Sequence, residues 1–446
     1  MERRVWLFYI FICCLFCPAC VTSQDKSEPV STVPLEQDTL EMEPDFSYEI
    51  TEQLPHILVD QTGYQSMDKK IAFFYGNELE ENFEIRNEKT EETVYTGLLH
   101  KVKEEDGKTL YSGTFTDFTK EGCYYLHHNK IGDSYAFSIE KNIYSRQYTD
   151  LNKMLLKQEH ENVGSLAYML ANCMFIKEMF QDAWINASFI HSKTALLLNS
   201  QDAKTGAFYS EILTEPVAFE TYEGTISLST TAQMAGVLAQ YSYIYREDKD
   251  TLLAGQCLQA AQKAYRYVEK YRDNTDTDAW YFAAVQLYRA TGQYKYRNAI
   301  REYDTLSEES RSSTPQGYTM LADFTYLATP YATDYKRCTG LLDAYIERAQ
   351  NISANSFREN FYVPSNIDTM SNKEILDDMF VLGVVNHVLS GQEYAGIQKN
   401  YIHYLSGINR KCKNYLSKDI VFSETDKGNE WSDAVELLVI YSNLYS

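Results

Sequence analysis

The chain has 446 residues, of which 44% are hydrophobic, so it can form two or three folded domains and is not a disordered protein. Its 41 basic and 63 acidic side chains give a net charge of −22, and such a field repels nucleic acids and anionic surfaces. We therefore expect no nucleic-acid partner. The cysteine and histidine spacings fit neither a disulfide framework nor a transition-metal site, so we expect no such metal.

The N-terminus has the layout of an export signal. Glu2-Arg3-Arg4 precedes an apolar run, Val5–Phe16, that is too short to span a bilayer as a mature helix. The next four residues, Cys17-Pro18-Ala19-Cys20, resemble the lipobox of bacterial lipoproteins, although Cys17 stands at the usual leucine position. We expect residues 1–20 to be a lipoprotein-type signal peptide with lipidation at Cys20; simple cleavage and an uncleaved anchor are the alternatives.

Residues 21–52 are polar, acidic and proline-containing. They cannot bury enough apolar surface to fold, so we expect a disordered tether. With a lipid anchor before it, this tether predicts an exported, cell-surface lipoprotein that is anchored to a bacterial membrane.

Residues 53–141 have the pattern of a β-rich domain. Short β-prone runs, separated by Gly, Asn, Asp and Lys turns, occur at 57–59, 71–74, 83–85, 93–95, 109–111, 123–126 and 135–139. About seven strands in about 85 residues predict an immunoglobulin-like β-sandwich.

Residues 146–446 have a helical pattern that is organised around Asp278–Tyr294. Trp280, Ala283 and Leu287 recur at three- and four-residue steps, which gathers them on one helix face, and Gly292 supplies the left-handed residue that ends the helix. About twelve such stretches are expected, near 147–158, 164–180, 182–198, 228–245, 250–270, 278–291, 294–307, 316–329, 334–351, 373–390, 394–408 and 429–444. They predict an (α/α)6 barrel of six helical hairpins.

Both domains resemble glycoside hydrolase family 9, a cellulase family with an N-terminal immunoglobulin-like domain. In the first domain the matching residues are Ile57–Tyr64, Lys70-Ile71-Ala72, Tyr95–Leu98, Asp117-Phe118, Gly122–Tyr125 and Phe137–Ile139. In the second they are Leu196–Asp202, Gly206–Tyr209, Ser229–Ala235, Asp278–Gly292, Ser371-Asn372 and Tyr404–Arg410. The resemblance implies a polysaccharide or oligosaccharide partner. It also allows a structural calcium ion, for which no loop in the sequence identifies ligands.

The catalytic base that the resemblance implies is missing. Inverting hydrolysis uses an acid and a base roughly 6.5–9.5 Å apart on opposite faces of the sugar. Family 9 carries its base in an Asp-Ala-Gly-Asp loop between the first two barrel helices, but here only Gln158–Gly164 joins them. Glu159 and Glu161 are the candidate replacement bases. The alternative is that both glutamates are merely solvated in a turn.

The catalytic acid of the family belongs to an Asn-Glu pair before the last helix, and Asn429-Glu430 matches that pair. Glu430 is therefore the acid candidate, and a carboxylate that only complements the helix dipole is the alternative. Aligning Trp431 on the family's aromatic residue would bring Asp426 or Glu424 to this place instead. The family's histidine-arginine segment is not reproduced by Lys411–Tyr415.

Four aromatic residues are candidates for stacking against sugar rings, because a flat apolar ring buries the face of a sugar. Tyr209 and Tyr222 lie in the connection that the family uses over its substrate groove, together with Phe219 and Glu223, whereas Trp280 and Trp431 open helices. The alternative is that these rings are core anchors, which their exposure decides.

The sequence leaves three functions open. The first is a family 9-like hydrolase of endo-β-glucanase type that cleaves β-linked polysaccharide and is divergent in its catalytic loops. The second is a catalytically inactive glycan-binding surface lipoprotein. The third is a structural envelope protein whose groove is filled by side chains, which low exposure of Trp280, Tyr209 and Tyr222 would favour.

Overall fold

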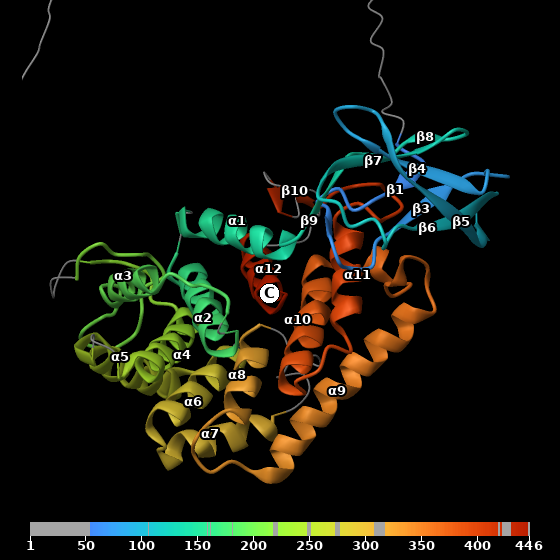
Figure 1. The fold of residues 1–446 in the computed structure, drawn as a ribbon. Coiled ribbons are helices and arrows are strands. Elements are labelled where there is room, and N and C mark those ends of the chain that lie inside the picture. Colours follow the sequence, from blue (N-terminus) through green and yellow to red (C-terminus); the bar gives the residue numbers. More distant parts are fainter. Residues whose placement is uncertain are drawn as a thin grey trace, which may run out of the picture. The chain divides into compact units, whose positions relative to one another are not determined.

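The fold is given by a computed structural model, shown in Figure 1. It describes residues 54–105, 107–157, 159–160, 162–180, 182–216, 222–247, 251–272, 277–306, 317–417, 420–421 and 430–444. The predicted signal peptide, Cys20 and the predicted tether lie outside these residues.

The first part of the described chain is a β-rich domain. Its strands are β1 (Ile57–Leu58), β2 (Tyr64–Gln65), β3 (Ile71–Tyr75), β4 (Asn82–Asn87), β5 (Thr93–Glu105), β6 (Lys108–Thr114), β7 (Gly122–His128), β8 (Gly132–Asp133) and β9 (Phe137–Glu140). Neighbouring strands follow the order β1-β3-β6-β5-β4-β7-β9-β2, and β8 pairs with β7. All seven runs expected from the sequence contain a strand, and the two-residue strands β2 and β8 were not expected.

The long strand β5 joins two layers of this domain. Its first half pairs with β4 from Thr93 to Leu98, and its second half pairs with β6 from Leu99 to Glu105. Side chains alternate along the strands, so one face of β3 carries Ala72 and Phe74 into the core of the β-domain. The other face carries Ile71 and Phe73 to the core of the helical domain.

The described residues that follow contain twelve α-helices, the number expected from the sequence. They are α1 (Ile143–Lys157), α2 (Val163–Met179), α3 (Ala187–Leu198), α4 (Leu228–Tyr245), α5 (Thr251–Tyr271), α6 (Thr277–Thr291), α7 (Tyr294–Asp304), α8 (Tyr318–Leu327), α9 (Tyr335–Phe357), α10 (Asn372–Val388), α11 (Ala395–Leu405) and α12 (Glu430–Asn443). Two short 3₁₀ turns, Asn360–Tyr362 and Ile367–Thr369, and a hairpin of β10 (Leu416–Ser417) and β11 (Ile420–Val421) complete the elements.

Three helix boundaries differ from the sequence expectation. Helix α1 begins at Ile143, before the expected domain start at 146, and α9 continues to Phe357. Helix α3 begins later than expected because the Asn186 side chain accepts a hydrogen bond from the Phe189 amide and caps the helix there. The expected stop after α6 is confirmed, since Gly292 has a φ of 67° and its amide bonds to the Tyr288 carbonyl.

The even-numbered helices lie next to one another in succession. Helix α2 neighbours α4, α4 neighbours α6, α6 neighbours α8, and α12 lies between α10 and α2 (Figure 1). Between α8 and α10, the rings of Phe324 and Phe380 lie 6.2 Å apart. These helices are buried almost all round, as in the run from Ala279 to Arg289 of α6. The odd-numbered helices bury one face, as in α5.

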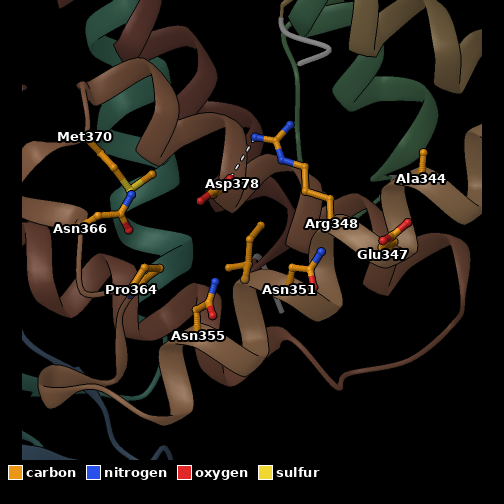
Figure 2. A pocket seen from close by; sticks show the side chains of 10 residues that line it. Ala344, Glu347, Arg348, Asn351, Asn355, Pro364, Asn366, Met370 and Asp378 are labelled. Carbon is orange, nitrogen blue, oxygen red and sulfur yellow. Dashed lines mark hydrogen bonds and ion pairs between the residues drawn. The ribbon is translucent and has the colours of Figure 1, made fainter. Parts of the chain in front are cut away.

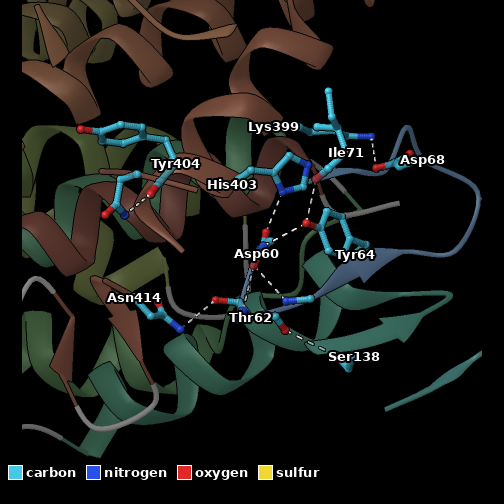
Figure 3. A network of polar contacts seen from close by, with 12 residues as sticks. Asp60, Thr62, Tyr64, Asp68, Ile71, Ser138, Lys399, His403, Tyr404 and Asn414 are labelled. Atoms are coloured by element: carbon cyan, nitrogen blue, oxygen red, sulfur yellow. Dashed lines mark hydrogen bonds and ion pairs between the residues drawn. The ribbon is translucent and has the colours of Figure 1, made fainter. Parts of the chain in front are cut away.

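Polar bonds connect the β-domain to α11 and the segment after it. The Gln61 amide donates to the Ser406 carbonyl at 2.8 Å, and the Gln61 side chain donates to the Cys412 carbonyl at 2.8 Å. Lys399 of α11 forms an ion pair with Asp68 at 2.7 Å (Figure 3). The two domains therefore form one folded unit over residues 53–446.

Candidate functional site

The starts of α2 and α4 lie together at one end of the helical domain, which we call the mouth. The amide of Val163, at the start of α2, donates to the Ser210 carbonyl at 2.8 Å. A Cβ atom on Gly164 would lie 2.9 Å from Oε1 of Gln233 in α4, so the starts of these two helices are closely packed. Of the sequence-predicted catalytic residues, Glu159 belongs to the connection that enters α2 at this mouth.

The connection between α1 and α2 is only the five residues 158–162. The Asn162 side chain accepts from the Ser165 amide at 2.8 Å and caps α2, so the chain turns directly into the helix. Glu159 is exposed in this turn, as a replacement base would have to be. Glu161 lies outside the described residues.

His160 is the titratable neighbour of Glu159. Burial, together with the positive charge of Lys193, lowers the pKa of His160 to about 4. The imidazole is therefore neutral at pH 7 and does not supply a proton there.

A buried charge cluster is formed by the buried Asp377 and Glu436 together with the partly buried Tyr168 and Lys373. The Lys373 ammonium is 2.5 Å from Oδ1 of Asp377, one turn further along α10, and 2.9 Å from Oε1 of Glu436 in α12. The hydroxyl of Tyr168 in α2 donates to the same Glu436 oxygen. Helices α2, α10 and α12 are thus joined by one set of charge-assisted hydrogen bonds.

Electrostatics keep Lys373 charged within this cluster. Burial works to lower the pKa of Lys373, but the carboxylates of Glu436 and Asp377 more than offset it, so its pKa is raised. Burial raises the pKa of Asp377 to about 6, although Lys373 opposes that shift. Asp377 and Glu436 are 0% and 2% exposed, so they hold the helices together and do not present a carboxylate to a sugar.

The sequence reasoning did not find this cluster. Two signals could have found it: the spacing of four between Lys373 and Asp377, and an acidic residue, Glu436, within an otherwise apolar helix. Lys373 and Glu436 are 63 residues apart in the chain, and the sequence alone does not show that they meet.

The two tyrosines expected at the groove differ in their exposure to solvent. Tyr222 is 37% exposed, whereas Tyr209 is 7% exposed. Their rings form an edge-to-face pair with centroids 4.8 Å apart, and Tyr209 is held by a β-bridge to Ile226. Only Tyr222 therefore presents a ring face of useful area, with the exposed Glu223 beside it. Phe219 lies outside the described residues.

The expectation that Trp280 stacks on sugar is wrong in this structure. The indole is 2% exposed, and its N–H donates to Glu269 at 2.7 Å. The Arg272 guanidinium lies 4.0 Å from the ring centroid, as in a cation–π contact. Trp280 is a core residue that ties α6 to α5.

The remaining predicted site residues are not described as side chains. Glu430 is the first residue of α12. Its side chain, the side chain of Trp431, and all of Asp426 and Glu424 lie outside the part of the chain that the structure describes.

The described residues contain no group of three or more His, Cys, Asp or Glu side chains placed to hold a metal ion. No helix among them is long and apolar enough to cross a membrane. The expected lipidation at Cys20 and the structural calcium that the resemblance allows stay predictions.

Two family models match the chain. Residues 156–418 match "Glycosyl hydrolase family 9", and residues 52–133 match "Cellulase N-terminal ig-like domain". No curated protein sequence matches the chain.

Three solved structures share the fold at low sequence identity. A metagenome-derived glycoside hydrolase family 9 endoglucanase is 17% identical with a TM-score of 0.71, over 87% of this chain and 99% of that one. A family 9 glycoside hydrolase of Bacteroides ovatus is 17% identical with a TM-score of 0.68, over 88% and 99%. A mutant thermostable endoglucanase of Alicyclobacillus acidocaldarius is 17% identical with a TM-score of 0.64, over 81% and 83%.

Proposed function

This chain belongs to glycosyl hydrolase family 9, and from that premise we propose that it cleaves β-linked polysaccharide, as an endo-β-glucanase, at a bacterial cell surface. The observation that carries the proposal is the family match over residues 156–418, with a fold like that of structures described as endoglucanases. The succession of neighbouring even-numbered helices supports the further proposal of a closed (α/α)6 barrel.

In the proposed reaction Glu430 is the general acid and protonates the leaving glycosidic oxygen. Its place at the first position of α12 supports this role, because the family's catalytic acid stands in an Asn-Glu pair just before its last helix. Glu159 or Glu161, in the connection before α2, removes a proton from the water that attacks the anomeric carbon from the opposite face. Tyr222 supports the sugar by stacking, since its ring is exposed.

A second candidate function is glycan binding without hydrolysis. It is favoured by the five-residue connection between α1 and α2, which is too short for the base loop of the family. Loss of general base assistance alone lowers a rate by roughly 10²–10⁴-fold. Tyr222 would still stack on a sugar, because stacking needs no catalytic carboxylate.

A structural role at the envelope is the third candidate. Burial of Trp280 and Tyr209 favours it, because two of the three rings expected at the groove are covered. Exposure of Tyr222 opposes it.

Surface anchoring through Cys20 is part of the proposal. The basic start, the short apolar run and the Ala19-Cys20 pair support it. Labelling of cells with a radioactive fatty acid should mark the wild-type chain and leave Cys20→Ala unmarked. A labelled Cys20→Ala chain would contradict the anchor.

The test of function is reducing-sugar release by the full chain from soluble β-glucans, xylan and glucomannan, run beside binding to the same panel. Release by the wild type that Glu430→Gln abolishes would support hydrolysis with Glu430 as acid. Binding without release would support the second function. Release that is unchanged in Glu430→Gln would overturn the acid assignment, and neither binding nor release would favour the structural role.

A further inference from the structure

One pocket of the helical domain is lined by residues of α9, of α10 and of the segment that leads into α10. It has a volume of about 400 Å³ and lies between α9 and the segment 364–370 (Figure 2). Pockets of this size are typical for small ligands. Its polar lining includes the carboxamides of Asn351, Asn355 and Asn366, and its apolar lining includes Ile352, Pro364 and Met370.

Helix α10 separates this pocket from the buried charge cluster. Asp377 pairs with Lys373, which also pairs with Glu436. The next residue, Asp378, pairs with Arg348 of α9. Consecutive helical residues point about 100° apart, so these two adjacent carboxylates lie on different sides of α10. The pocket and the charge cluster therefore lie on different sides of α10, and the described lining of the pocket includes neither Glu159 nor Tyr222.

Three amides are available to a ligand in the pocket. Asn351 and Asn355 are four residues apart on α9 and lie on the same helix face, and Asn366 comes from the facing segment. Figure 2 shows the Asn355 and Asn366 carboxamides directed into the space between helix and segment. All three residues are exposed, and their side chains make no hydrogen bond to another described residue.

Charge in the pocket disfavours anionic ligands. The Arg348 guanidinium lies 2.9 Å from Oδ1 of Asp378, and Tyr401 donates to the other oxygen of that carboxylate at 3.2 Å. Arg348 is thus matched by a partner of opposite charge, and the exposed Glu347 adds a further negative charge. A ligand that fits is neutral and hydrogen-bonds through hydroxyl groups.

The segment that faces α9 is held in a fixed conformation. Phe361 and Tyr362 have φ of 60° and 55°, a backbone region that bulky residues rarely adopt. The Phe361 ring packs edge-to-face on Phe73 of β3 with centroids 4.8 Å apart, and Lys69 lies 4.7 Å from the Tyr362 ring centroid. These contacts tie the two residues just before the pocket segment to the β-domain, and a segment that is ordered before a ligand arrives lowers the entropic cost of binding.

We propose that this pocket is an accessory binding site for a neutral sugar unit of the polysaccharide. Each carboxamide offers two donors and an acceptor, which suits neighbouring hydroxyl groups of a pyranose ring. Ile352, Pro364 and Met370 supply apolar surface for the C–H face of the same ring. The inference rests on the proposed action on glycans and adds to it a second site that holds the polymer.

The test measures binding of cellohexaose and soluble β-glucan to the full chain by calorimetry and affinity electrophoresis. Asn351→Ala with Asn355→Ala should weaken binding about tenfold, because several hydrogen bonds are lost. Alanine favours a helix more than asparagine does, so the variant should fold. Gln350→Ala is the matched control, since Gln350 is an exposed amide of α9 outside the pocket, and should bind as the wild type does.

The outcomes separate this site from the proposed function. Wild-type affinity in the double variant, together with weaker binding by Tyr222→Ala, would overturn the accessory site and leave the action on glycans standing. No binding of either glycan by the wild type would overturn both. Binding of polygalacturonate that depends on Asn351 and Asn355 would overturn the assignment to neutral sugars.

Discussion

The Nδ1 atom of His403 lies 2.6 Å from Oδ2 of Asp60, a partner 343 positions earlier in the chain (Figure 3). Both side chains are buried. The other carboxylate oxygen of Asp60 accepts from the amides of Thr62 and Gly63 at 2.8 and 2.9 Å. One carboxylate therefore fixes the turn before β2 and also holds α11 of the helical domain.

Asp60→Ala should destabilise the protein by about 3–5 kcal/mol, because it leaves the buried His403 ring and two turn amides without their acceptor. Urea unfolding of the full chain measures this loss. The matched control is Asp133→Ala, which removes a carboxylate 2.5 Å from His127 at an exposed position and should cost much less. An equal loss of unfolding free energy in the two variants would show that the buried pair of Asp60 and His403 stabilises the protein no more than an exposed pair does.

Much of the fold could be predicted from the sequence because its signals are local. The β-prone run Ile71–Phe74 predicts a strand, and the three- and four-residue steps from Trp280 to Leu287 predict a helix. Gly292 marks a helix end for a similar reason, since only its own backbone conformation is involved. These signals need no knowledge of what packs against the segment.

The candidate site could be predicted less well because its contacts are not local. Trp280 opens a helix, which suggested a place on the rim, but Glu269 of α5 and Arg272, directly after α5, cover it. Lys373 and Glu436 meet only when α10 and α12 are side by side. The roles of Glu430 and Glu161 stay predictions, because neither side chain is among those described.

The pH dependence of stability should reflect Asp323 of α8. Burial raises the pKa of Asp323 to about 6, and the hydroxyls of Tyr281 and Tyr345, which donate to it at 2.7 and 2.9 Å, oppose that shift only in part. Arg337, 3.9 Å away, is itself paired with Asp304. The pKa of an unfolded aspartate is about 3.9, so the folded protein holds a proton between about pH 4 and 6 that the unfolded chain releases.

Protonated Asp323 therefore adds to the free energy of unfolding at low pH, and this stabilisation is lost as the pH rises through about 6. A shift of about two pKa units corresponds to about 3 kcal/mol. Asp323→Asn should remove this dependence. Between pH 4 and 7, the free energy of unfolding should fall in the wild type by about 3 kcal/mol more than it falls in Asp323→Asn. Asp343→Asn, at an exposed position of α9, should follow the wild type. Parallel curves for Asp323→Asn and wild type would contradict the shift.

Lys373→Met should destabilise the protein at pH 7 by about 3–5 kcal/mol, because Asp377 and Glu436 would remain buried without their cation. Adding Asp377→Asn should recover part of this loss, since it removes one of the two uncompensated carboxylates. Lys101→Met, which breaks an exposed pair with Glu104, should leave the urea unfolding curve nearly unchanged. If the double variant is no more stable than Lys373→Met, the cluster does not act through charge balance.

Substitutions of Trp280 and Tyr222 should have opposite effects on stability and glycan binding. Trp280→Ala removes a buried indole and leaves Glu269 without its donor, so it should cost about 3–5 kcal/mol in urea unfolding. Below its unfolding transition it should bind soluble β-glucan as the wild type does. Tyr222→Ala should keep the wild-type unfolding curve and weaken binding, because its ring is exposed and is proposed to stack on the sugar. Trp280→Phe, which fills part of the same space, serves where the alanine variant does not fold. A Trp280→Phe variant of wild-type stability that no longer binds glycan would return Trp280 to the binding groove, since loss of packing alone could not produce that result.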